Sequence, residues 1–210
     1  MHTTEAHPLA LAVNAIERQG YAIMDDYLSS SNMAALATIV KEKWFAGQMV
    51  SAKTGKATLK NQTIRGDFIA WLDENDSQPA VQAYFRQGEL LRLMLNMQLL
   101  MNVQSLETHV VVYPVGSVYQ KHLDQFNSGA TPHLQQRQLS ASLDLNPNWQ
   151  AHHGSALRLH LAENTHIDIL PKSGRIVLFL SAKFWHEVLP ATHERLSLTG
   201  WFRTREQSIF

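Results

Sequence analysis

The chain has 210 residues, of which 45% are apolar and 17% charged, and its 18 basic residues balance its 18 acidic residues. This composition predicts one globular domain over residues 1–210, and the zero net charge argues against a nucleic-acid or membrane-surface partner. With 11 histidines and no cysteine, disulfides and thiolate metal sites are excluded, and imidazoles and carboxylates are the metal ligands available.

The first 101 residues predict mainly helices. No signal-peptide pattern opens the chain and no apolar run reaches the length of a membrane span, so we expect a cytoplasmic protein. Apolar residues recur at helical spacing in three segments: Pro8 to Gly20, Ser29 to Gly47 and Pro79 to Met101. Short apolar runs predict strands at Tyr21–Met24 and Phe68–Leu72.

Residues 48–63 interrupt this pattern. The segment is polar and carries Lys53, Lys56 and Lys60, with no acidic residue until Asp67. We expect an exposed loop or an irregular hairpin. Its role stays open between a solvated connection and a functional loop, because long structureless loops are often functional.

From Thr108 the pattern changes to short strands separated by turn residues, and we expect residues 108–205 to form the core. The expected strands are His109–Tyr113, Gln138–Leu145, Ala156–Leu161, His166–Leu170, Arg175–Leu180 and Arg195–Phe202. Strict alternation between 138 and 145 places Ser140, Ser142 and Asp144 on one face and apolar residues on the other. The fold class is therefore mainly β, a barrel or sandwich supported by N-terminal helices.

His122 and Asp124 are the first two residues of a candidate metal site. They lie two residues apart, so on a strand their side chains point to the same face. His186, 62 residues after Asp124 and expected at the end of the 176–180 strand region, supplies a third ligand. Two histidines and one carboxylate form the facial triad of non-haem iron(II) oxygenases, which leaves positions open for a chelating cosubstrate and O₂. A second pair, His166 and Asp168, precedes His186 too closely for a strand-turn-strand path back to it.

Arg195 begins a strand whose alternation places Ser197, Thr199 and Trp201 on the same face as the guanidinium. An arginine inside a β-barrel needs an anion, because an unpaired buried charge is very costly. A carboxylate suits the guanidinium fork, and Ser197 offers a second hydrogen bond. Two partners stay open: the carboxylate of a ligand, or a structural ion pair with Asp144.

Together these residues resemble the 2-oxoglutarate/Fe(II) dioxygenases, specifically the prolyl 4-hydroxylase-like branch that contains the hypoxia-factor prolyl hydroxylases and their bacterial relatives. The resemblance runs from about residue 64 to residue 205, and the order and spacing of its motifs make it specific. The matching segments are Ile64-Arg65-Gly66-Asp67 with Trp71, Tyr113-Pro114, Tyr119-Gln120-Lys121-His122-Leu123-Asp124, Leu145-Asn146 with Trp149, Gly154 with Leu157-Arg158, Ile169 with Pro171, Trp185-His186-Glu187-Val188, and Arg195 with Trp201.

This resemblance implies a double-stranded β-helix, a jelly-roll of the cupin-like kind, packed against N-terminal helices. It implies that His122, Asp124 and His186 bind Fe(II), that Arg195 holds the distal carboxylate of 2-oxoglutarate, and that Tyr113 hydrogen-bonds near this cosubstrate. Ascorbate is implied as a reductant.

The reaction that the resemblance implies is hydroxylation of a prolyl residue in a protein substrate, which consumes O₂ and 2-oxoglutarate and gives succinate and CO₂. Residues 48–63 would then close over the substrate protein. We expect the substrate to contact Trp201 and two residues near the hinge of that loop, Arg65 and Asp67.

One residue departs from the family pattern. The hypoxia-factor branch has a tyrosine at the position that aligns with Asp144, where a carboxylate repels 2-oxoglutarate unless a cation offsets it. We expect Ser197 or Thr199 to take over the role of the tyrosine hydroxyl.

Two other functions stay open. One is the same chemistry on a free amino acid or small metabolite, which a short or absent closing loop would favour. The other is a non-catalytic β-barrel metal-binding protein, in which Asp144 occupies the cosubstrate pocket. A zinc hydrolase is disfavoured, because the sequence has no His-Glu-x-x-His motif.

Overall fold

The computed structural model describes residues 7–52, 64–125 and 136–205. Most helices come before most strands, as the sequence predicts. The elements are α1 (Pro8–Gln19), β1 (Tyr21–Met24), α2 (Ser30–Phe45), β2 (Val50–Ser51), β3 (Phe68–Trp71), α3 (Pro79–Leu99), β4 (Val103–Tyr113), β5 (Tyr119–His122), β6 (Arg137–Asp144), a 3₁₀ turn (Ala151–His153), β7 (Leu157–Ala162), β8 (Thr165–Ile169), β9 (Ile176–Leu180), β10 (His186–Val188) and β11 (Arg195–Thr204).

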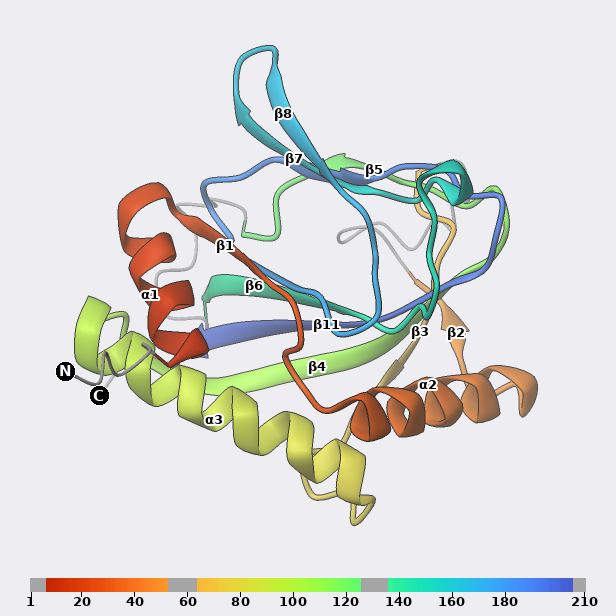
Figure 1. The fold of residues 1–210 in the computed structure, drawn as a ribbon, viewed down its shortest axis with the longest axis horizontal. Coiled ribbons are helices and arrows are strands. Elements are labelled where there is room, and N and C mark those ends of the chain that lie inside the picture. Colours follow the sequence, from red (N-terminus) through yellow and green to blue (C-terminus); the bar gives the residue numbers. More distant parts are fainter. Residues whose placement is uncertain (1–6, 53–63, 126–135, 206–210) are drawn as a thin grey trace, which may run out of the picture.

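The strands form two antiparallel sheets that face each other as a double-stranded β-helix (Figure 1). The large sheet has the strand order β1-β9-β6-β11-β4-β3-β2, and the small sheet has the order β5-β10-β7-β8. The three helices cover the outer face of the large sheet, and the small sheet lies on its other side (Figure 1). The large sheet is therefore buried on both faces, which confirms the predicted fold class.

The outer face of the large sheet packs on the helices through an apolar cluster. In α1, the residues Leu9, Val13 and Ile16 recur at helical spacing and are almost fully buried in this cluster. Gly20 ends the helix with a φ of 88°, a left-handed conformation that glycine adopts without steric cost. Leu143 of β6 belongs to the same cluster, so the helices and the large sheet share one core.

The strand β6 buries two chemically different faces. Its apolar residues at odd-numbered positions join the cluster beneath the helices. Ser140, Ser142 and Asp144 point to the opposite side, between the two sheets, and are also buried. Buried hydroxyl and carboxylate groups need partners or a ligand, so this inner face is a candidate for the functional site.

The structure corrects one detail of the sequence analysis. His186 does not end the strand at 176–180, because it begins the separate strand β10 in the small sheet. Within residues 48–63, Val50–Ser51 forms β2 and pairs antiparallel with β3, in keeping with the irregular hairpin that the sequence left open. These strands have two or three residues, too few to show a periodicity in the sequence. Residues 53–63, which include the three lysines, lie outside the described residues.

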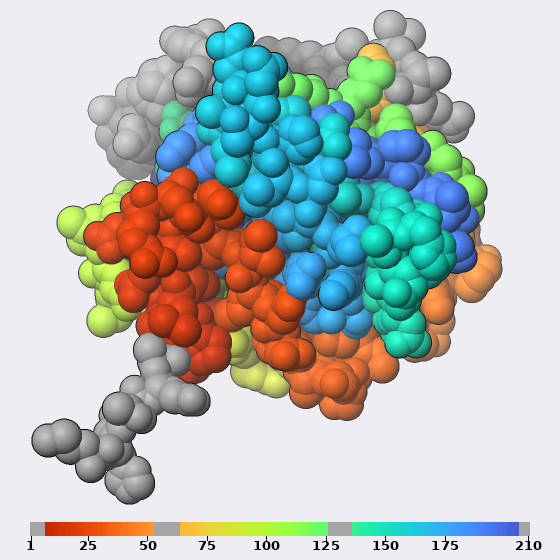
Figure 2. Space-filling view, turned by 45° about the horizontal axis from the view of Figure 1, so that its top comes forward, coloured from red at the N-terminus to blue at the C-terminus, as the bar shows by residue number. Residues whose placement is uncertain are grey.

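The β7–β8 hairpin projects beyond the rest of the small sheet (Figures 1 and 2). It carries His166 and Asp168, both exposed, so this second His-x-Asp pair lies on the surface and apart from the candidate metal ligands. Elsewhere on the same face, the red surface of α1 and β1 adjoins the blue surface of β9 (Figure 2), because β1 pairs with β9. None of the described helices is long and apolar enough to cross a membrane.

Asn146 provides a test of how the strands are held together. Its buried side chain accepts a hydrogen bond from the N–H of Leu196 and donates to the carbonyls of Pro171 and Leu196. We expect Asn146→Ala to lower the free energy of unfolding by about 2–4 kcal/mol, because it leaves the N–H of Leu196 and the carbonyl of Pro171 without the Asn146 side chain as partner. Chemical denaturation measures the change.

The matched control is Asn75→Ala, which removes an exposed side chain whose amide donates to Asp73. We expect a change within about 0.5 kcal/mol for this surface substitution. Equal losses for the two variants would contradict the role given to Asn146.

Candidate functional site

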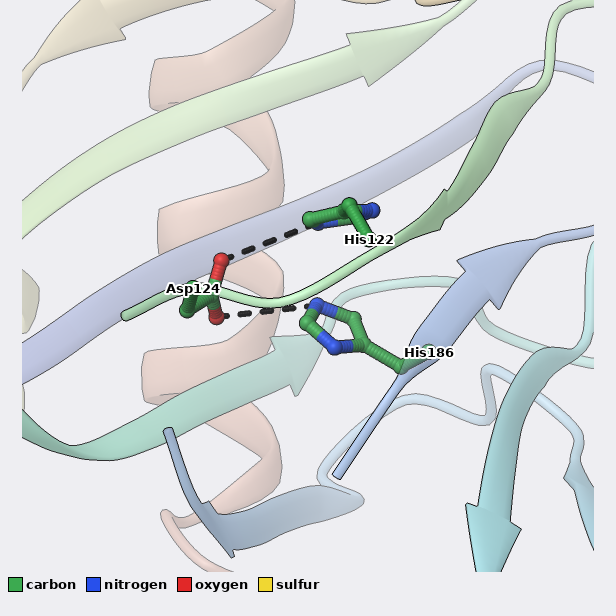
Figure 3. Close-up of side chains that lie close together, drawn as sticks. All are labelled: His122, Asp124 and His186. Carbon is green, nitrogen blue, oxygen red and sulfur yellow. Dashed lines mark ion pairs between the residues drawn. The ribbon is translucent and has the colours of Figure 1, made fainter. Parts of the chain in front are cut away.

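His122, Asp124 and His186 come together between the two sheets (Figure 3). His122 ends β5 and His186 begins β10, and these residues lie directly opposite each other in the antiparallel pair. Asp124 follows β5 by two residues. Its Oδ1 lies 3.6 Å from the Nε2 of His122, and its Oδ2 lies 3.6 Å from the Nε2 of His186. The three side chains offer ligand atoms within 4.8 Å of one another.

Backbone carbonyls orient both imidazoles. The Nδ1 of His122 lies 2.8 Å from the carbonyl of Gln120, and the Nδ1 of His186 lies 3.2 Å from the carbonyl of Phe184. A carbonyl only accepts, so each Nδ1 carries the hydrogen and each Nε2 keeps a lone pair for a metal. The carboxylate is held as well, because the Ser140 hydroxyl donates to the Oδ2 of Asp124 over 2.6 Å.

The electrostatics of the three residues suit metal binding. Burial lowers the pKa of His186 to about 4, so its imidazole is neutral near neutral pH. Burial alone would raise the pKa of Asp124. The facing imidazoles and the Ser140 hydroxyl outweigh burial and hold that pKa below its usual range. Neutral imidazoles and an ionised carboxylate are the forms that bind a metal.

This donor set fits iron. Two imidazoles and one carboxylate on one side of a metal are the facial arrangement of non-haem Fe(II) oxygenases. Zinc sites built on helical His-Glu-x-x-His motifs place their ligands on one helix, whereas here they come from the ends of two strands. The three residues form a candidate iron site, as the sequence analysis predicted.

A pocket opens beside the candidate iron site. The inner faces of β4, β6 and β11 form its polar wall, and apolar side chains from the small sheet and from β9 form the rest of the lining. Its lining residues are Arg65, His109, Tyr113, Tyr119, His122, Asp124, Ser140, Ala141, Ser142, Leu157, Phe179, His186, Val188, Arg195, Ser197, Thr199 and Trp201. The sequence analysis selected ten site residues, and nine of them line this one pocket; the exception is Asp67.

Arg195 lies in the pocket and is 1% exposed. Its Nη2 and Nε both donate to the Oδ1 of Asp144, over 2.7 and 3.2 Å. Three polar atoms of this cluster have no hydrogen-bond partner among the described residues: the Nη1 of Arg195, the Oδ2 of Asp144 and the Oγ of Ser197. The ion pair that the sequence left open is thus present, yet one guanidinium nitrogen remains free for an anion.

Arg65 and Asp67 form a second buried ion pair. The guanidinium donates twice to the carboxylate, over 2.8 and 3.0 Å, and its Nη1 donates to the hydroxyl of Tyr119. The ring of Tyr119 stacks on His122 at a centroid distance of 3.6 Å. This chain of contacts connects Arg65 to a candidate iron ligand, although Asp67 itself does not line the pocket.

Aromatic and imidazole rings form another part of the wall. His109 lies between Trp71 and Trp201, with ring centroids 5.2 and 5.1 Å away. Burial lowers the pKa of His109 to about 3, which keeps it neutral. Arg137 lies 3.5 Å above the ring of Trp201.

Sequence reasoning did not select Tyr119, Ser140, His109 or Arg137 for the site. The alternation that places Ser140 on the inner face of its strand was the available signal for that residue. For His109 and Arg137, the signal was only a place on or beside an expected strand, and for Tyr119 it was membership of the segment 119–124 that resembles the family.

The comparisons with known proteins agree with this geometry. The family model of the 2OG-Fe(II) oxygenase superfamily matches residues 108–203. A prolyl-4-hydroxylase from Pseudomonas putida is 37% identical, with a TM-score of 0.83, and the match covers 94% of this chain and 99% of that one.

Two further structures are similar. One is a prolyl hydroxylase from Trichoplax adhaerens in complex with a hypoxia-inducible factor peptide, 26% identical with a TM-score of 0.82 over 92% of this chain and 88% of that one. The other, a viral collagen prolyl hydroxylase from Paramecium bursaria Chlorella virus-1, is 17% identical and shares the fold, with a TM-score of 0.67 over 90% of this chain and 98% of that one.

The hydrogen bond from Ser140 to Asp124 gives a testable prediction. We expect Ser140→Ala to weaken Fe(II) binding by about 10- to 100-fold, because the carboxylate loses the group that orients it. Competition with a chromogenic chelator under argon measures the affinity. Ser142→Ala is the control, since Ser142 lies on the same face of β6 but makes no hydrogen bond to Asp124, and it should bind Fe(II) as the wild type does. Equal affinities for all three proteins would show that Ser140 does not hold the ligand.

Proposed function

Because the chain belongs to the 2OG-Fe(II) oxygenase superfamily, it is an Fe(II)- and 2-oxoglutarate-dependent dioxygenase, and we propose that it hydroxylates a prolyl residue in a protein substrate. The identity of 37% to a prolyl-4-hydroxylase, over almost the whole of both chains, is the observation that carries this proposal. The peptide complex of the Trichoplax enzyme supports a peptide over a free amino acid. Fold alone would not support a substrate, since one fold serves many reactions.

The metal and cosubstrate supply the oxidative chemistry: O₂ and 2-oxoglutarate are consumed, one oxygen atom enters the substrate and the other enters succinate, and CO₂ leaves. Under this proposal His122, Asp124 and His186 hold the Fe(II). Two features support that assignment. The Nε2 atoms of both histidines face the carboxylate of Asp124, and hydrogen bonds from the Nδ1 atoms to backbone carbonyls fix both rings.

We assign the distal carboxylate of 2-oxoglutarate to Arg195. Its free Nη1 supports this role, because a buried guanidinium nitrogen without a partner is expensive and a carboxylate satisfies it. Ser197, whose hydroxyl also has no partner among the described residues, is assigned a second hydrogen bond. Thr199 and Tyr113 line the same pocket and are assigned contacts with the cosubstrate.

The assigned substrate contacts lie elsewhere on the pocket wall. Arg65 and Trp201 line the pocket, and Asp67 fixes the orientation of Arg65 through two hydrogen bonds. A rigid guanidinium and an indole suit a peptide, because they meet backbone carbonyls and the flat face of a prolyl ring. The apolar side chains of Leu157 and Val188, from the small sheet, face the polar wall, and Phe179 lies beside Ser140 in the large sheet. We assign these three side chains the role of excluding water from the reacting atoms.

The test compares proline in peptides with free proline. We expect the Fe(II)-loaded protein to add one oxygen atom to proline-containing peptides, with succinate formed in proportion. The kcat/KM for a peptide should exceed that for free L-proline by at least about tenfold, since only the peptide contacts the whole pocket. Mass spectrometry of the peptide and quantification of succinate give both numbers.

Two controls define the result. The same peptide with alanine in place of proline should gain no oxygen, and His122→Ala should lose both products. A kcat/KM that favours a free amino acid over every proline-containing peptide would contradict the proposal and support a metabolite hydroxylase.

A further inference from the structure

The two buried arginines that line the pocket are already neutralised by carboxylates. Arg65 is paired with Asp67, and Arg195 is paired with Asp144. Arg137 shares the carboxylate of Glu107 with Arg203, but it begins β6, at the opposite end of that strand from Asp144. Neither Arg65 nor Arg195 therefore offers an unopposed positive charge to an anion that enters the pocket.

This arrangement leaves a charge unbalanced when 2-oxoglutarate binds. The cosubstrate carries two carboxylates. Fe(II) together with Asp124 leaves one net positive charge, which balances the proximal carboxylate. The distal carboxylate meets Arg195, whose charge Asp144 already cancels. One net negative charge would then be buried, which is strongly unfavourable without compensation.

Asp144 is fully buried. Among the described residues, the other cation that acts on its carboxylate is Arg175, whose own charge is paired with Asp25. Arg175, which precedes β9, accepts the backbone N–H of Asp144 on its carbonyl, but its guanidinium makes two hydrogen bonds to Asp25 over 2.6 and 2.8 Å. From β4, the ring of Tyr113 lies 5.3 Å from the guanidinium of Arg195, and burial raises the pKa of Tyr113, so it stays neutral. From β11, only Arg195 and the hydroxyl of Ser197 face the carboxylate.

We infer that Asp144 takes up one proton from solvent when 2-oxoglutarate binds, and that it thereby sets the affinity of the pocket for the dianionic cosubstrate. The inference uses the cosubstrate of the family and is independent of the proposed prolyl substrate. Asp144 is in this sense a positioning residue, because it acts on the cosubstrate through Arg195.

The geometry of the ion pair accommodates the proton. Both hydrogen bonds from Arg195 go to the Oδ1 of Asp144. The Oδ2 has no partner among the described residues, so a proton there breaks no bond. The resulting O–H needs an acceptor, and the arriving carboxylate is one. Burial also raises the pKa of Asp144, and the attraction of Arg195 offsets this only in part.

The sign of the pH effect follows from the proton balance. Above the pKa of Asp144 in the free protein, that carboxyl is ionised, whereas in the complex it is protonated. Binding therefore consumes a proton, and a rise in pH opposes binding. The dissociation constant for 2-oxoglutarate should rise about tenfold for each pH unit.

Isothermal titration calorimetry tests this with 2-oxoglutarate and Fe(II)-loaded protein under argon, between about pH 6.5 and about pH 8.5. Titration in two buffers of different ionisation enthalpy counts the protons taken up, and we expect about one for each 2-oxoglutarate bound. Asp144→Asn keeps the oxygen that accepts from Arg195 and offers a neutral N–H donor. This variant should take up no proton, show no pH dependence, and bind more tightly than the wild type at the alkaline end.

Asp168→Asn is the matched control. Asp168 also accepts two hydrogen bonds from an arginine, Arg158, but on the exposed hairpin, so this variant should keep the slope of the wild type. The inference would be overturned by a wild type that binds 2-oxoglutarate equally well across the pH range without proton uptake, or by an Asp144→Asn variant that keeps the slope.

Two measurements on the wild type test the inference even if Asp144→Asn does not fold. They are the number of protons taken up on binding and the infrared difference spectrum. A new carbonyl stretch of a protonated carboxylic acid should appear on binding, and its absence together with no proton uptake overturns the inference. No peptide enters these titrations, so a failure here is distinct from a failure of prolyl hydroxylation.

Discussion

The antiparallel pairing of β5 with β10 is the constraint on which the site depends. It sets His122 and His186 directly opposite each other, from strands that are far apart in the sequence. Because side chains alternate along a strand, a slip of one residue would turn one of the two imidazoles away from the pocket. The short β10 resists such a slip because β7 pairs with its other edge, with His186 opposite Leu159. Ser140 then binds Asp124 from the large sheet, so both sheets contribute to the metal site.

Burial of charge is the second constraint. In the part of the chain that the structure describes, the space between the sheets contains two ion pairs in which both partners are largely or fully buried, Arg65 with Asp67 and Arg195 with Asp144. The free energy needed to bury an unpaired charge in either place is far larger than the stabilisation from one hydrogen bond. Each arginine therefore needs its carboxylate before any ligand is present. Pairing fixes the guanidinium groups in one orientation, and preorganised groups bind a ligand with less loss of conformational freedom. The same pairing limits how much negative charge the pocket accepts.

Much of this was available from the sequence, and the reason differs from one residue to the next. The alternation in β6 and β11 correctly placed Ser140, Ser142 and Asp144 on the face of Arg195, because the period of a strand is fixed by its backbone. The strand β10 was not predicted, since three residues show no period and its position depends on two partner strands. Likewise, the contact between Tyr119 and Arg65 joins residues 54 positions apart, and no local pattern encodes it.

The strand β6 also connects the two ends of the pocket. Ser140, near its start, binds the candidate iron ligand Asp124, and Asp144, at its end, binds Arg195. Four residues of strand separate these positions by about 13 Å. Its pairing with β11 places Trp201 opposite Ser140 and Ser197 opposite Asp144. One strand and its register therefore set the metal end and the anion end of the pocket relative to each other. Substitutions at either end of β6 are consequently coupled in their effect on the cosubstrate, because a shift of this strand moves both ends together.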